Sequence, residues 1–487
     1  MNTNTWNTED LEDWNQRIVE LVQKFGLNPY PQEFEVCDYE GMLSYVVYSG
    51  MPSHYPHWSY GKGYEKLKTL YDYGLSGLPY EMVINSNPSI AYLMRDNSLA
   101  LQILTIAHVY AHSDFFKNNF TFKTTHAEYT IETFKAHANR VRHYIEDPSI
   151  GLEKVETILD AAHALSLQCR RNLAIKKERP EEEKRRKIDE AEPPHDPFSA
   201  IHRRSERVEP DLKKIPPYPD EDILIFIRDH NPHLAEWEKD LLTIVHQQAQ
   251  YFIPQIETRI MNEGWASFWH KRIFEALDPP QELRLEFIVR HTQVLCPTPG
   301  GLNPYHVGMK IWENIEERWN KGRFGQKYDL CPASERDDWD TKTMKGRDKI
   351  FMVREVERDS SFLRRFLTED LVRELKLFEY QFKGNDRVVS RVADEDNWQA
   401  IKNTLIQNVG TGTIPVIKVE DADYNGSRTL FLKHAHDGRD LQLEYAENTL
   451  KYVQRLWGHK VVLETTVNEK PMLLCFADDK FTVKPIQ

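Results

Sequence analysis

The stretch Met261–His270 (MNEGWASFWH) restricts the fold of this chain more than any other segment. It is expected to lie in a helix over residues 255–276, and Glu263 and His270 are seven residues apart, so both project from one face of that helix. Between them this face carries only small residues, while two tryptophans and a phenylalanine surround the rest of the turn. Because so aromatic a helix is expected to be buried, its carboxylate and its imidazole need polar partners or a metal ion.

A second helix carries two further imidazoles on one face. His108 and His112 are four residues apart, so both can bind one ion, as the two histidines of HExxH do in zinc peptidases. The residue after His108 is Val109, so the general-base glutamate of that motif is missing. Together with Glu263 and His270, the pair is sufficient for a mononuclear site that holds a divalent metal ion of the zinc type.

A third polar stripe consists of Glu156, Asp160 and His163, which follow one another at helical spacing among apolar neighbours. These side chains are candidates to orient the metal ligands from outside. If all three helices converge, a dinuclear carboxylate–histidine site of iron or manganese in a helical bundle is an alternative, although it needs more bridging carboxylates than the sequence supplies.

Each of these patterns also has a purely structural interpretation. An HxxxH pair is often a hydrogen-bonded core pair, a Glu-Asp-His stripe is often a buried network that fixes helix register, and aromatic clusters usually form core. A loop with His54, His57, Trp58 and Lys62 either lines the same pocket or is only structural. Its two prolines and Gly61 predict that no long helix forms there.

Composition limits the class of protein. The net charge of −13 argues against a binder of nucleic acid or of anionic membranes. No apolar run approaches the roughly 20 residues of a transmembrane helix, and the N-terminus is polar and acidic without a signal peptide. The five scattered cysteines form no CxxC pair, as is typical of a reducing compartment. We therefore expect a cytoplasmic protein with no transmembrane segment.

Hydrophobic periodicity predicts an α+β protein with a large, mainly helical domain and a smaller C-terminal α/β domain. The polar core of the large domain is expected to be zincin-like or a helical bundle. Residues 1–172 and 221–385 are assigned to this domain, and residues 386–487 to the α/β domain. The charged, proline-rich residues 173–220 are expected to form a linker or surface excursion.

Several long motifs resemble the stage V sporulation protein R family: NEGWASFWH, HVYAHSDFFKNNF, SGMPSHYPHWSYGK, GLPYEMVINSNPSIAYLMRDN and LDAAHAL. The similarity runs from about residue 8 into the C-terminal domain. It implies a bacterial cytoplasmic protein that spore formers need for the spore cortex, which is modified peptidoglycan. The family also occurs in bacteria that form no endospores, which implies an activity broader than sporulation.

A more local similarity concerns Asn262–Ala266, which looks like the second motif of gluzincin-type zinc peptidases. It implies that Glu263 is the third metal ligand beside His108 and His112, with His270 as fourth ligand or proton shuttle. Since Val109 replaces the usual base, either Asp114, Glu156 or Asp160 takes that role, with His163 in the same catalytic group, or the site has no hydrolytic role.

The leading hypothesis is therefore metal-assisted hydrolysis of an amide or related bond in cortex formation, with an unidentified substrate or protein of the peptidoglycan pathway as partner. The competing hypothesis is a non-enzymatic regulatory or scaffold protein, in which the polar stripes only hold helices together.

Overall fold

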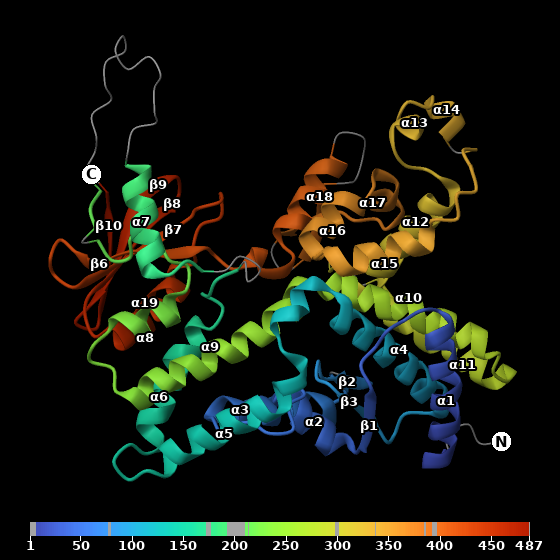
Figure 1. The fold of residues 1–487 in the computed structure, drawn as a ribbon, viewed down its shortest axis with the longest axis horizontal. Helices are drawn as coiled ribbons and strands as arrows, with labels where there is room; N and C mark the ends of the chain where they lie inside the picture. Colours follow the sequence, from blue (N-terminus) through green and yellow to red (C-terminus); the bar gives the residue numbers. More distant parts are fainter. Residues whose placement is uncertain are drawn as a thin grey trace. The chain divides into compact units, whose positions relative to one another are not determined.

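Helices make up most of the chain in the computed structural model (Figure 1). The structure describes residues 6–75, 79–171, 177–191, 210–212, 214–297, 301–336, 338–383, 386–391 and 397–486. The fold is α+β, with a large, mainly helical part and a smaller C-terminal α/β part, which confirms the predicted class. No helix in these ranges is both long enough and apolar enough to span a membrane.

Two compact units divide the chain. Unit 1 consists of Met1–Asn139 and Phe252–Thr413, and unit 2 consists of Arg140–Tyr251 and Ile414–Gln487. Two helices, α5 (Thr130–Glu146) and α9 (Glu236–Glu257), include residues of both units.

Unit 1 begins with helices and a small sheet. Its first elements are α1 (Thr8–Lys24), β1 (Gln32–Cys37), α2 (Tyr39–Val47), α3 (Trp58–Asp72), β2 (Glu81–Val83), β3 (Ser89–Met94), α4 (Leu99–Asn118), and the 3-10 helices η1 (Phe120–Thr124) and η2 (Ala127–Tyr129). The strand order is β1-β3-β2, with β1 parallel and β2 antiparallel to β3. Strand β2 therefore lies at an edge of this sheet, and it contacts α4.

The second half of unit 1 is helical apart from one two-stranded ribbon. Its elements are α10 (Arg259–Leu277), α11 (Gln281–Leu295), α12 (Pro304–Lys321), α13 (Gln326–Asp329), α14 (Ala333–Arg336), α15 (Gly346–Val356), α16 (Asp359–Phe366), α17 (Glu369–Glu374), β4 (Glu379–Lys383), β5 (Asp386–Arg391), α18 (Trp398–Gln407) and η3 (Gly410–Thr413). Helix α10 packs against both α4 and α12 (Figure 1). Since α4 and α10 are buried over most of their circumference, these two helices form the centre of the unit 1 core.

Helix α10 is held in place at two points. A Cβ atom added to Gly264 would lie 2.3 Å from the backbone carbon of Gly308, so only glycine allows α10 and α12 to approach this closely. At its N-terminus, the buried carboxylate of Asp359 accepts hydrogen bonds of 2.9 Å from the N–H groups of Ile260 and Met261. These contacts satisfy two amides that a helix start leaves unpaired, and they fix where the side chains of α10 point.

Unit 2 contains α6 (Leu152–Leu165), α7 (Pro180–Glu190), α8 (Ile223–His230), β6 (Ile417–Tyr424), β7 (Thr429–His434), α19 (Leu443–Trp457), β8 (Val461–Val467), β9 (Lys470–Ala477) and β10 (Lys480–Pro485). The sheet order is β10-β9-β8-β7-β6, in which only β7 and β8 are parallel. Helix α19 connects that parallel pair and packs against α6 and the sheet. The expected C-terminal sheet is present, together with β10, which the sequence pattern did not predict.

Three local expectations need correction or refinement. Residues 58–72 form helix α3, although a long helix was excluded there: the prolines precede its start at Trp58, and Gly61 lies in open space where a helix tolerates it. The predicted linker contains helix α7, and the rest of it lies partly outside the described residues. Contacts group Arg140–Tyr251 with Ile414–Gln487 in unit 2, whereas the sequence pattern assigned most of the first segment to the large domain. The domain ranges expected from the sequence stay a prediction.

Candidate metal centre

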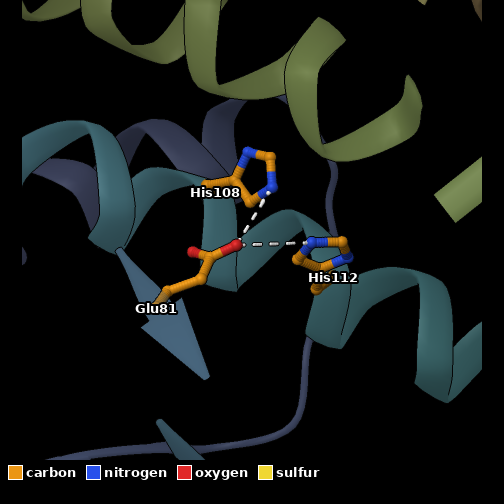
Figure 2. Close-up of side chains that lie close together, drawn as sticks. All are labelled: Glu81, His108 and His112. Carbon is orange, nitrogen blue, oxygen red and sulfur yellow. Dashed lines mark ion pairs between the residues drawn. The ribbon is translucent and has the colours of Figure 1, made fainter. Parts of the chain in front are cut away.

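Glu81, His108 and His112 come together from an edge strand and a helix (Figure 2). The Oε1 atom of Glu81 lies 3.1 Å from Nε2 of His108 and 3.6 Å from Nε2 of His112. The two imidazoles share one face of α4 because they are one helical turn apart, and Glu81 is the first residue of β2. One ligand atom of each residue lies within 4.8 Å of the other two, so one metal ion can bind all three.

Glu263 brings a second carboxylate from α10. Its Oε2 atom lies 3.4 Å from Nε2 of His112 and 4.0 Å from Nε2 of His108. The side chain of Glu263 is 21% exposed, whereas those of His108 and His112 are 0% and 5% exposed. Glu263 is therefore the most exposed of these three side chains, although its Oε2 atom is buried.

Several ligand atoms at this centre lie close to oppositely charged groups but make no hydrogen bond of good geometry among the described residues: Nε2 of His108, Oε2 of Glu81 and Oε2 of Glu263. An unsatisfied buried polar atom costs about 1–3 kcal/mol, so a cluster of them is unfavourable unless a ligand binds. Imidazole nitrogens and carboxylate oxygens are ligands that zinc and similar divalent ions accept. The donor set therefore fits a divalent metal ion.

Hydrogen bonds on the far side of the imidazoles set their orientation. Nδ1 of His112 lies 2.8 Å from Oδ1 of Asn262, and Nδ1 of His108 lies 2.7 Å from Nδ1 of His270. Nε2 of His270 in turn lies 2.7 Å from Nδ1 of His291. Outer contacts of this kind orient metal-binding histidines and fix their tautomers. His270 thus lies behind His108, away from the carboxylates, and its predicted role as a ligand or proton shuttle stays a prediction.

Burial and neighbouring charges shift the pKa values of Glu81, His108 and His112. Burial raises the pKa of Glu81 to about 7, although the neighbouring His112 opposes the shift. Burial alone would lower the pKa of His112, but its contacts with Glu263 and Glu81 raise it to about 10. Burial and the nearby imidazoles hold the pKa of His108 well below its usual range. In the absence of an ion, a protonated His112 therefore balances the carboxylates, and a bound cation would take over that role.

Two tyrosines lie beside the centre. The ring of Tyr80 is 5.9 Å from the ring of His108, and that of Tyr305 is 6.1 Å from it. Burial and the nearby carboxylates raise the pKa of both phenols, so both hydroxyls stay protonated and can donate hydrogen bonds.

Both carboxylate oxygens of Asp114 are already hydrogen-bonded within the protein, although Asp114 lies only two residues from His112. Both carboxylate oxygens accept a hydrogen bond from Nη1 of Arg354, at 2.7 and 2.8 Å. Oδ2 also accepts one from the indole N–H of Trp265 at 2.9 Å, and Oδ1 accepts one from the backbone N–H of Asn28 at 2.7 Å. The side chain is fully buried. The observed contacts give Asp114 a structural role, and its assignment as a base stays a prediction.

Glu156, Asp160 and His163 lie on α6, in unit 2, where all three are partly exposed. Their catalytic role therefore stays a prediction. In the loop before α3, His54 packs among Tyr48, Tyr55 and Tyr60, as an aromatic cluster does. The exposed Trp58 ring lies under the ammonium group of Lys62.

Sequence reasoning missed Glu81, Tyr80, His291 and Asn262. Glu81 is the single carboxylate in the apolar run LPYEMVI, and a lone charge in such a run is the one sequence feature that indicates a buried functional group there. No spacing rule links it to a helix that begins 18 residues later, since only the pairing of β2 with β3 brings it to α4.

Comparisons with known proteins agree with the motifs. The family model "SpoVR like protein" matches residues 5–414, and "SpoVR-like C-terminal domain" matches residues 415–468. The uncharacterized protein YcgB of Escherichia coli (strain K12) is 31% identical over 492 residues, which cover 95% of this chain and 95% of YcgB. No solved structure matches.

Proposed function

The chain belongs to the SpoVR family, and we propose that it is a sporulation protein whose buried His/Glu centre binds a divalent metal ion, zinc in the first place, and hydrolyses an amide or related bond. The observation that carries the proposal is the cluster of Glu81, His108 and His112, whose ligand atoms lie within 4.8 Å of one another and include atoms without partners among the described residues. Structural networks in protein cores satisfy most of their polar atoms, so several atoms without a hydrogen bond at one centre support a ligand there.

The geometry suggests a division of roles. His108 and His112 would hold the ion through their Nε2 atoms, and Glu81, whose carboxylate is closest to His108, would complete the set. Glu263, assigned as the third ligand from the sequence, is the more exposed carboxylate, so we assign to it the acceptance of a proton from water. A bound metal ion would polarise the scissile carbonyl and lower the pKa of a water molecule.

Membership in the family supports the biological role that we propose. We assign the protein to spore cortex formation in the cytoplasm, where finished cortex is out of reach. Its substrate would then be a peptidoglycan precursor, a peptide or a protein of the assembly pathway.

The metal content of the purified protein tests this proposal. Protein prepared without added metal should contain about one transition-metal ion per chain, and the double variant His108→Ala/His112→Ala should lose it while its circular dichroism spectrum persists. The matched control is His230→Ala/His233→Ala, which removes two exposed histidines of unit 2 and should retain the ion.

Activity is tested with soluble peptidoglycan-precursor peptides, with released amines as the readout. The metal-containing protein should release amines, and the His108→Ala/His112→Ala variant should not. Metal-free wild-type protein that does not take up zinc would refute the proposal and favour the scaffold hypothesis.

A further inference from the structure

The five-stranded sheet of unit 2 has two edge strands, β6 and β10, and within the described ranges only β6 is covered. The backbone groups of Val419 exchange hydrogen bonds of 2.7 and 3.1 Å with those of Asp220. The N–H of Ala422 also donates to the carbonyl of Ile215 at 2.7 Å. Strand β10 pairs with β9 on one side, and no strand among the described residues pairs with its other side. All but one of its residues are exposed, so this edge can accept another strand.

The turn between β9 and β10 determines which backbone groups of β10 face outward. Asp478 and Asp479 both have positive φ, 49° and 57°, as in a two-residue type I′ hairpin turn. The residue after such a turn, here Lys480, forms a hydrogen-bonded pair with the opposite strand, and every second residue of β10 follows it. Beyond the far end of the strand, the N–H of Ile486 donates to the carbonyl of Pro471 at 3.0 Å, which fits the same alternation.

Phe481 and Val483 therefore direct both their N–H and their C=O groups away from β9. Their side chains project from one face of the sheet, whereas those of Lys480, Thr482 and Lys484 project from the other. An added strand would bond to the backbone of Phe481 and Val483, and its side chains would lie about 4.5–5.5 Å from those directly opposite. The edge thus presents two exposed lysines four residues apart on one face, and two apolar side chains on the other.

The two lysines determine which strand fits this edge. If the outward groups of two copies bonded to each other in an antiparallel pair, Lys480 of each copy would lie opposite Lys484 of the other. Like charges directly opposite each other destabilise a sheet, and lysines on an edge strand prevent this kind of self-pairing. A strand with carboxylates at these two positions has the complementary charge. The two aspartates of the turn lie beyond the paired part of the edge.

We propose that β10 is a docking edge for an extended, acidic segment of a partner protein, which adds to the sheet as a further strand. The segment carries carboxylates opposite Lys480 and Lys484 and apolar side chains beside Phe481 and Val483. Its main chain supplies the affinity, and the alternating side chains supply the specificity. This interaction surface belongs to unit 2 and does not depend on the metal centre of unit 1.

A labelled peptide with the core Glu-Val-Thr-Val-Glu tests the charge complementarity. Fluorescence anisotropy should show that the whole chain binds this acidic peptide at least tenfold more tightly than a peptide with the core Lys-Val-Thr-Val-Lys. The double variant Lys480→Glu/Lys484→Glu should reverse the preference. High salt should reduce it in both proteins, because exposed charges are screened.

The variant Val483→Pro tests the backbone contact. It removes an N–H that faces away from β9, and an edge strand accepts proline at such a position, so the melting curve should match that of the wild type. An added strand loses one hydrogen bond, and the acidic peptide should bind about tenfold more weakly. The same loss is expected for the wild type with a peptide whose two valine nitrogens are methylated, which needs no change in the protein.

The matched control is Lys451→Glu/Arg455→Glu. These two exposed cations of unit 2 are also four residues apart, but they lie on α19. The variant changes the net charge as much as Lys480→Glu/Lys484→Glu does and leaves the edge intact. It should bind the acidic peptide as the wild type does.

Four results would overturn the inference. They are no binding of the acidic peptide by the wild type, equal losses in the two charge-reversed variants, unchanged binding of both the Val483→Pro variant and the methylated peptide, and a wild-type dimer that Val483→Pro dissociates. The last would assign the edge to a second copy of the chain. None of these results alters the metal content of the protein, which tests the proposed function separately.

Discussion

Two buried polar clusters lie on the same pair of helices, α4 and α10, and differ in how their atoms are satisfied. Around Asp114, each carboxylate oxygen is hydrogen-bonded, and Arg354 supplies the opposite charge. Around His108, two carboxylates and two imidazoles converge, yet several of their atoms make no hydrogen bond of good geometry among the described residues. Along α4, Asp114 is only two residues from His112 and six from His108.

This difference indicates a structural role for the Asp114 cluster and a binding role for the His108 cluster. The ion pair of Asp114 and Arg354 stabilises one arrangement of the helices, and it occupies both carboxylate oxygens, although Nε of Arg354 makes no hydrogen bond among the described residues. A group of acceptors without hydrogen bonds is costly, and a bound ligand removes that cost, so several such atoms in one place favour a functional site. The comparison predicts that the Asp114 cluster determines stability and that the His108 cluster determines binding.

The largest expected effect tests the structural cluster. Arg354→Met leaves the buried Asp114 carboxylate without its cation and should lower the free energy of unfolding by about 3–5 kcal/mol. Urea denaturation measures this loss. The control Arg373→Met breaks an exposed pair with Glu369 and should cost less than about 1 kcal/mol. Equal losses in both variants would contradict the assignment of Asp114 to the core.

The next effect concerns the outer contacts of the metal centre. His270→Gln disturbs the hydrogen bond that orients His108, and it should weaken Zn²⁺ binding roughly 10- to 100-fold while one ion per chain still binds at saturation. Competition with a fluorescent zinc chelator gives the affinity. A complete loss of the site at saturating zinc would instead favour His270 as a direct ligand. His230→Gln, in unit 2, should bind zinc normally.

A third prediction uses pH and the carboxylate that holds the start of α10. Burial raises the pKa of Asp359 from 3.8 to about 7, although two backbone N–H groups oppose the shift. The folded state therefore holds this proton where the unfolded chain has lost it, so stability falls as pH rises from about 4 to about 7. Between pH 5 and 7 the wild type should lose about 2 kcal/mol more than Asp359→Asn, as measured by urea denaturation. Parallel pH profiles would contradict this prediction.

The smallest change in stability is expected for Glu263→Gln, which can be compared directly with the equivalent exchange Asp114→Asn. Glu263→Gln removes a carboxylate that pairs with His112 but repels Glu81, and because these two effects oppose each other, the metal-free protein should change in stability by less than about 1 kcal/mol. The same exchange at the satisfied cluster, Asp114→Asn, should cost more, because it breaks the pair with Arg354. Thermal melts in the presence of a chelator compare the two variants, and a larger loss for Glu263→Gln would reverse the assignment of the two clusters.

Local patterns in the sequence determined much of this protein. Spacing within a helix placed His108 beside His112 and Glu263 on the same face as His270, because helical periodicity is a property of neighbouring residues. The same periodicity predicted most of the helices and the C-terminal strands, and the motifs identified the family.

Only the tertiary structure decided which polar residues meet. Glu81 reaches the histidines through a strand pairing, and Asp114 is neutralised by an arginine that lies 240 residues away in the sequence. Contacts of this range depend on how helices and strands pack, for example on the glycine pair that lets α10 approach α12, and no local spacing encodes them. The sequence therefore specified the ligating side chains on each helix, and packing determined which of them share one centre.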